Sequence, residues 1–102
     1  MISIKYNGFY FPDIIQYPDG TFKINIPDIP VNNNSPLEIV WTYRNESELS
    51  LLIGISENLK ENYNNPINLY MPYLPNARMD RTHSKNEVFT LKYFCKIINF
   101  LN

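Results

Sequence analysis

The chain has 102 residues, a formal net charge of −1 and 44% hydrophobic residues, which fits one small folded domain and excludes general disorder. Lysine and arginine are scattered singly, so no basic stripe indicates a nucleic acid as a direct partner. A single cysteine excludes an internal disulfide, and neither a signal peptide nor an apolar run of roughly 20 residues is visible, so we expect a cytoplasmic protein and no membrane.

Residues 1–26 are predicted to form a β-hairpin followed by a further strand. Apolar and aromatic residues flank Asn7-Gly8, the dipeptide that best accepts the positive φ angles of a two-residue type I′ turn. Apolar residues then alternate over residues 22–26, which predicts a half-buried strand. Residues 27–36 contain three prolines and three consecutive asparagines, so we expect an exposed, flexible loop.

Residues 37–71 are predicted to form a βαβ unit with parallel strands at 37–41 and 67–71. The helix between the strands is expected to begin with a capping box formed by Asn45 and Glu48. Its apolar stripe is predicted to contain Leu49, Leu52, Ile53, Ile55 and Leu59. Four glutamates are expected on the solvated face of this segment: Glu46, Glu48, Glu57 and Glu61.

Residues 72–84 are predicted to form a loop after the second parallel strand, where open α/β sheets place their ligands. Arg78 and Arg81 offer fork-shaped donors suited to phosphate oxygens, and Asp80 can lock one of them or face a metal. On chemistry alone, an exposed turn with an arginine–aspartate salt bridge is the favoured alternative. His83 is expected to be a solvent-exposed loop residue.

Residues 85–102 are predicted to form a final helix, opened by a capping box of Ser84 with Glu87. Cys95 falls on its apolar stripe and is expected to be a small buried hydrophobic residue. The predicted fold class is therefore α/β: an N-terminal β-hairpin plus a βαβα unit with a partly parallel sheet, in a single domain at 1–102.

Four blocks in chain order resemble ribose-phosphate pyrophosphokinases, also called phosphoribosyl pyrophosphate synthetases, and most closely their phage-like branch. MPYLPNARMDR at 71–81 resembles the family signature PYARQDR. YPDGT at 17–21 resembles the F-x-D-G-E turn, RNESEL at 44–49 the start of the first long helix, and FTLK at 89–92 the I-T-A-K helix. The resemblance implies the first part of the synthetase's phosphoribosyltransferase-like N-terminal domain.

The family binds Mg-ATP between subunits, which implies a nucleotide site in this chain. By resemblance, Arg78 contacts the phosphates, Met79 lies beside the adenine, and the turn at Tyr17 and Asp19 covers the base. The residues so implied are Tyr17, Asp19, Arg78, Met79, Asp80 and Arg81. Met79 stands where the family has Gln, and the family's metal-binding His, catalytic loop and ribose-phosphate loop are missing, so no catalytic residue or metal ligand is predicted.

Three functional hypotheses follow. The preferred one is a non-catalytic protein-binding or regulatory protein, for example a phage or mobile-element inhibitor of a host defence protein, acting in the host cytoplasm alone or as a homo-oligomer. Its protein-interaction candidates are Tyr73, Asn76, Arg78, Arg81 and His83. The first alternative is an N-terminal fragment or split half of a synthetase that binds Mg-ATP. The second is a pseudo-subunit that regulates a homologous host synthetase.

Overall fold

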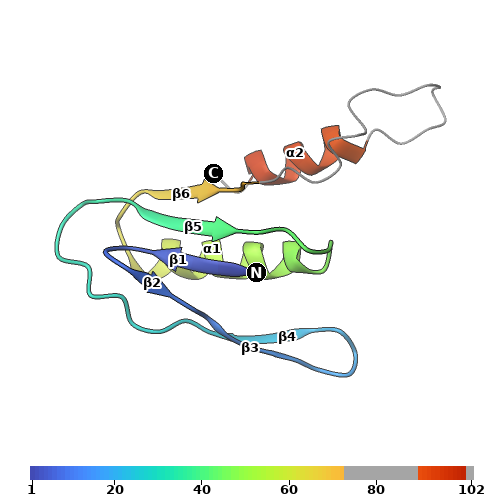
Figure 1. The fold of residues 1–102 in the computed structure, drawn as a ribbon, viewed down its shortest axis with the longest axis horizontal. Coiled ribbons are helices and arrows are strands. Elements are labelled where there is room, and N and C mark those ends of the chain that lie inside the picture. Colours follow the sequence, from blue (N-terminus) through green and yellow to red (C-terminus); the bar gives the residue numbers. More distant parts are fainter. Residues whose placement is uncertain (73–89, 101–102) are drawn as a thin grey trace. The chain divides into compact units, whose positions relative to one another are not determined.

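A mixed four-stranded sheet with one helix, joined to a separate two-stranded hairpin, makes up the first 72 residues of the chain (Figure 1). The computed structural model describes residues 1–72 and 90–100, which belong to two separate units, with side chains described for 94–99 of the second. The elements of the first unit are β1 (Ile2–Lys5), β2 (Phe9–Tyr10), β3 (Asp13–Gln16), β4 (Phe22–Asn25), β5 (Leu37–Trp41), α1 (Glu48–Asn62) and β6 (Ile67–Tyr70). This mixed α/β architecture with an N-terminal hairpin confirms the predicted fold class.

The first hairpin forms around Asn7-Gly8, as predicted. β1 and β2 are antiparallel, and Lys5 lies opposite Phe9. This register leaves three residues in the connection, so the prediction of a two-residue turn is wrong. Asn7 and Gly8 have φ angles of 52° and 136°, and the Tyr6 N–H donates to the Gly8 carbonyl at 2.9 Å, which closes a turn of this length.

A second hairpin joins β3 and β4, and the sequence pattern predicted only its second strand. Its turn is a hydrogen-bonded one: the Gly20 N–H donates to the Tyr17 carbonyl at 2.9 Å, and the Tyr17 N–H donates to the Thr21 carbonyl at 2.8 Å. Gly20 has a φ of 91°, which glycine adopts without strain. β3 has four residues, of which only Ile14 and Ile15 are apolar, so its sequence pattern is too brief to indicate a strand.

The predicted βαβ unit is confirmed. β5 and β6 pair in parallel, with Leu37 opposite Ile67 and α1 in the connection between them. α1 ends at Asn62, shortly before Asn64-Asn65-Pro66, whose proline cannot continue a helix. β1 pairs antiparallel with the other edge of β5, which gives the strand order β2-β1-β5-β6.

The start of α1 differs from the predicted capping box. Ser47 occupies the N-cap position in helical conformation, and its side chain makes no capping hydrogen bond to the helix. The carboxylate of Glu48 accepts the backbone N–H of Arg44 at 2.7 Å, and does not bond the N–H of Asn45. Glu48 is only 4% exposed, so its expected place on the solvated face is also wrong, whereas Glu46, Glu57 and Glu61 are exposed as predicted.

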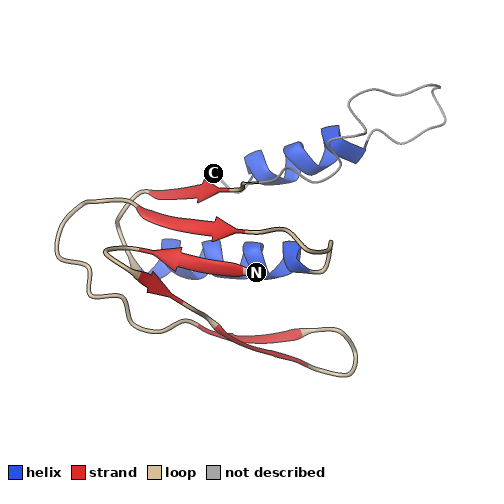
Figure 2. Ribbon diagram, in the orientation of Figure 1, coloured by secondary structure: helices blue, strands red, loops and turns tan. Residues whose placement is uncertain are grey.

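The core lies between α1 and the sheet face that α1 covers (Figure 2). Its strand residues share one face by alternation, and its helix residues recur at helical spacing. These residues are Ile2, Ile4, Tyr6, Leu37, Ile39, Trp41, Leu51, Leu52, Ile55 and Leu59. Leu51 is 5% exposed and Ile53 is 39% exposed, so the buried stripe of the helix includes Leu51 in place of the predicted Ile53.

Residues 27–36 form no regular secondary structure, as predicted, but they are not wholly exposed. Ile29 is 4% exposed, and its N–H donates to the Tyr63 hydroxyl at 3.1 Å. The Tyr6 hydroxyl lies 3.0 Å from Asn33 Oδ1, and a second contact joins it to the Asn32 backbone at 3.3 Å. The side chains of Tyr6, just after β1, and Tyr63, just after α1, thus tie this loop to the core. Its flexibility stays a prediction.

The second unit contributes the helix α2 (Thr90–Phe100). A helix within 85–102 was predicted, and the proposed capping residues Ser84 and Glu87 lie outside the described residues. Cys95 is half-buried, so it is less enclosed than its predicted place in an apolar core. No helix in the described ranges is long and apolar enough to cross a membrane.

Gly54 sets how closely the β3–β4 hairpin approaches α1. A Cβ built at Gly54 would lie 3.3 Å from Cδ1 of Ile24, a half-buried side chain that can shift by a few tenths of an ångström. We expect Gly54→Ala to raise the free energy of unfolding by about 0.5 kcal/mol, because alanine is favoured in a helix interior by about 1 kcal/mol. Urea denaturation measures this change.

Gly54→Leu is the informative contrast, because its side chain must displace the hairpin. We expect it to lower the free energy of unfolding by about 2 kcal/mol. Asn58→Ala, at an exposed position of the same helix, reports helix propensity alone. A loss of more than about 1 kcal/mol for Gly54→Ala would show that the hairpin cannot yield, and would contradict this account.

Candidate functional site

Two of the site residues expected from the sequence, Tyr17 and Asp19, lie in the described part of the chain. The other nucleotide-binding and protein-interaction candidates lie outside it: Tyr73, Asn76, Arg78, Met79, Asp80, Arg81 and His83. The structure therefore tests neither the Mg-ATP site nor the predicted loop at residues 72–84, and both stay predictions. Within the described residues, no group of three or more His, Cys, Asp or Glu side chains could hold a metal ion.

The turn that contains Tyr17 and Asp19 closes the β3–β4 hairpin. Oδ1 of Asp19 accepts the hydroxyl of Thr21 at 2.7 Å and its backbone N–H at 3.0 Å. These two hydrogen bonds hold the pKa of Asp19 below its ordinary value, and the bond from the Thr21 hydroxyl has the larger effect. The carboxylate of Asp19 is thus engaged in its own turn, while Tyr17 is 45% exposed.

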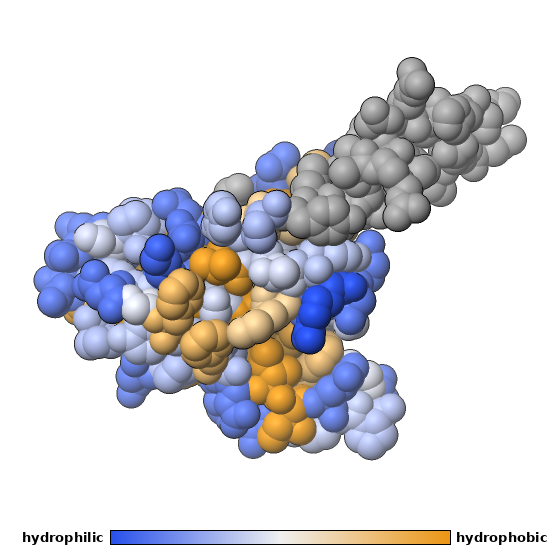
Figure 3. Space-filling model, viewed as in Figure 1, coloured by the Kyte–Doolittle hydropathy of each residue, from blue (hydrophilic) through white to orange (hydrophobic). Residues whose placement is uncertain are grey.

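Exposed side chains recur at the odd-numbered positions of residues 9–17. All five of these positions are exposed, and four of them carry large apolar or aromatic side chains, whereas Gln16 is the one even-numbered residue of the segment that is exposed. We call this surface the stripe: Phe9 (55% exposed), Phe11 (56%), Asp13, Ile15 (48%) and Tyr17 (45%). Figure 3 shows apolar side chains gathered over β2 and the β3–β4 hairpin.

Two contacts order the part of the stripe nearest β1. The rings of Phe9 and Phe11 stack with their centroids 6.4 Å apart. Nζ of Lys5 lies 5.8 Å from the centroid of the Phe9 ring, within the range of a cation–π contact. The rings of Phe9 and Phe11 are therefore held in place before any partner binds.

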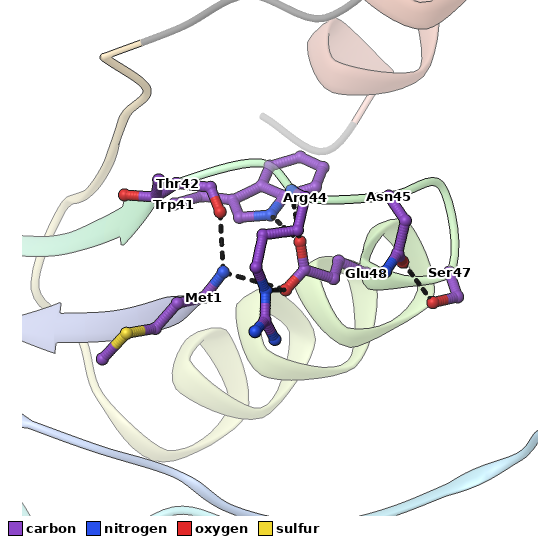
Figure 4. Close-up of polar contacts among 7 residues, drawn as sticks. All are labelled: Met1, Trp41, Thr42, Arg44, Asn45, Ser47 and Glu48. Carbon is purple, nitrogen blue, oxygen red and sulfur yellow. Dashed lines mark hydrogen bonds and ion pairs between the residues drawn. The ribbon is translucent and has the colours of Figure 1, made fainter.

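On the other side of β3, near the start of α1, the buried carboxylate of Glu48 collects hydrogen bonds from three places in the chain (Figure 4). The N-terminal ammonium of Met1 lies 2.8 Å from Oε2, and Nε of Arg44 lies 3.2 Å from the same oxygen. Oε1 accepts the Arg44 backbone N–H at 2.7 Å and Nε1 of Trp41 at 3.4 Å. The ammonium also donates to the Thr42 carbonyl at 2.6 Å.

These contacts decide the charge of Glu48. Burial raises the pKa of Glu48, but hydrogen bonds from the Met1 ammonium and from the backbone and guanidinium of Arg44 outweigh it. The pKa falls from 4.5 to about 2, so the side chain is a carboxylate at neutral pH. The side chains of Met1 and Arg44 are 64% and 69% exposed. In both ion pairs, therefore, only the Glu48 carboxylate is buried.

A groove of about 500 Å³ lies between this cluster and the β3–β4 hairpin. Arg44, Glu48 and the amino-terminal residue Met1 form its polar side, together with Asn45 and Ser47. Its remaining lining is mostly apolar and comes from β1, the β2–β3 connection, β3, β4 and α1: Ile2, Phe11, Pro12, Ile14, Gln16, Phe22 and Leu51. Ile14 and Gln16 are the even-numbered residues of β3, so the groove and the stripe use alternate positions of one strand.

No protein-family model and no curated protein matches the chain. The resemblance to ribose-phosphate pyrophosphokinases therefore stays a prediction. The stripe and the groove rest on the geometry of residues 1–51 alone.

Sequence reasoning missed both features that the structure brings out. The exposure of the odd-numbered residues of 9–17 leaves no pattern in the sequence, because Tyr10 and Ile14 are as aromatic or apolar as their exposed neighbours and Pro12 separates two short strands. The role of Glu48 has no sequence pattern, because its partner Met1 is 47 residues away. The excess of tyrosine and phenylalanine is the one general indication of a contact surface.

Glu48→Gln tests the carboxylate cluster. The folded-state pKa lies below the unfolded value, so the carboxylate stabilises the fold above about pH 4.5 and loses this effect as the pH falls toward 2. We expect the variant to be less stable by about 3 kcal/mol at pH 7, and by less than about 1 kcal/mol near pH 2. Urea denaturation of both proteins across this pH range measures the difference.

Glu57→Gln is the matched control, because Glu57 is exposed and lies 3.6 Å from Lys60 in a surface pair. We expect it to change the free energy of unfolding by less than about 0.5 kcal/mol at any pH. A Glu48→Gln difference that stays constant from pH 7 to pH 2.5 would contradict the assignment of the effect to the charge.

Proposed function

We propose that this chain is a non-catalytic protein-binding or regulatory protein of the cytoplasm, and that the stripe is its contact surface. The observation that carries the proposal is the exposure of four large residues at odd-numbered positions of residues 9–17, between 45% and 56% each. Single exposed apolar residues are common, but several of them within one short segment are typical of an interaction surface. Aromatic residues are enriched in such contacts.

The backbone that carries the stripe supports the proposal, because it is already ordered. β2 pairs with β1 and β3 pairs with β4, so neither strand has to fold when a partner binds. The stacked rings of Phe9 and Phe11 lose little further conformational freedom. A preformed surface of this kind lowers the entropic cost of association.

Charge favours a different protein over a second copy of this chain. Asp13 lies at the centre of the stripe, with two apolar residues on each side. In a two-fold symmetric contact centred on the stripe, Asp13 would face the same carboxylate of the other copy, and like charges repel. A partner with a lysine or arginine opposite Asp13 and apolar residues around it fits this pattern.

Site-specific photo-cross-linking tests the proposal, because it captures a bound protein of any sequence. The photoreactive residue p-benzoylphenylalanine is placed singly at Phe9, Ile15 or Tyr17 and irradiated in the cells that produce the protein. Ile53, an exposed apolar residue of α1 at 39% exposure, is the matched control position. We expect the same discrete adduct with another protein from all three stripe positions and none from Ile53.

A second variant ties the adduct to the charge pattern. We expect Asp13→Lys to reduce the Ile15 adduct about tenfold, because a cation on the partner would then meet a cation. Adducts that are absent from the stripe, or equally abundant at Ile53, would overturn the proposal. If the sole adduct had twice the mass of the chain, the partner would be a second copy of this chain and not a different protein.

A further inference from the structure

The edge of β3 that faces away from β4 has unpaired backbone groups. Tyr17 and Thr21 are joined by a backbone hydrogen bond, so the alternation of an antiparallel ladder bonds the odd residues of β3 to β4. The N–H and C=O groups of Ile14 and Gln16 therefore point away from β4, where the described residues provide no partner. An unpaired edge is a template for another extended segment.

The groove beside these two residues combines an apolar floor with a net positive charge. Phe22 and Leu51 contribute apolar side chains to it. On its polar side, the positive charges of the Met1 ammonium and the Arg44 guanidinium outnumber the negative charge of Glu48 by one, so the polar side carries a net positive charge. The Nε of Arg44 bonds Glu48, and no contact engages its two terminal nitrogens among the described residues. Those nitrogens form a fork that suits a carboxylate.

We propose that this groove binds an extended peptide segment of a partner protein, one that carries an apolar residue and an acidic residue. The peptide backbone pairs with the free edge at Ile14 and Gln16, its apolar side chain lies against Phe22 and Leu51, and its carboxylate meets Arg44. The acidic residue is required by the charge of the site, and the extended conformation by the strand edge. This inference rests on the proposed protein-binding function but uses a different face of β3 from the stripe.

A peptide array tests the inference with the intact chain. Heptapeptides with a central leucine carry a glutamate at each other position in turn, and matched peptides carry glutamine or lysine there. The best peptides are then measured in solution by fluorescence polarisation. We expect a glutamate peptide to bind about tenfold more tightly than its glutamine counterpart, as a hydrogen bond to a charged group contributes, and the lysine peptide to bind least.

Variants separate the two contacts. We expect Arg44→Gln to remove the difference between the glutamate and glutamine peptides, a ratio measured within one variant and so independent of its stability. Gln16→Pro removes the N–H at the free edge and is expected to abolish binding, while Gln16→Ala keeps the N–H and the binding. Circular dichroism confirms that each variant is folded.

The inference is overturned if no heptapeptide binds at about 1 mM. It is also overturned if glutamate and glutamine peptides bind the unaltered protein equally, or if Gln16→Pro binds as well as Gln16→Ala. The failure of these experiments leaves the cross-links from Ile15 and Tyr17 unaffected, because those side chains do not line the groove. The loss of those cross-links, in contrast, removes the proposed function itself.

Discussion

The interaction on which the rest of the structure depends is the buried carboxylate of Glu48. It joins the amino end of β1, the segment after β5 and the first turn of α1, three places that are brought together only in the folded chain. A buried charge is tolerated only when its hydrogen bonds are made, and here each carboxylate oxygen has two partners. The carboxylate thus fixes where α1 begins relative to the sheet that it covers.

The groove is a consequence of this arrangement. Met1, Arg44 and Glu48 form one of its walls, and the β3–β4 hairpin forms the other. The same hairpin approaches α1 at Gly54, where an added Cβ would lie 3.3 Å from Cδ1 of Ile24. The carboxylate cluster and the hairpin therefore bound the space that an extended segment would have to enter.

Local patterns in the sequence predicted most of the fold. The largely apolar run of β5 and the helical spacing in α1 indicate burial, and Asn7-Gly8 indicates a backbone preference, so these elements could be predicted from local sequence. The capping box was wrong because Asn45 and Glu48 have the right spacing, but Glu48 gains more from the distant Met1 ammonium and from Arg44. Spacing along one helix carries no information about a partner 47 residues away.

The candidate surfaces were missed for a related reason, which also explains how they fit together. A strand presents alternate residues to opposite sides, and in β3 each side carries one isoleucine, Ile14 on one and Ile15 on the other, so the sequence does not indicate which side faces inward. The structure assigns Ile14 and Gln16 to the groove and leaves Ile15 and Tyr17 on the exposed stripe. One short strand thus supplies both surfaces, and a partner that occupied the groove and the stripe together would enclose β3 from two sides.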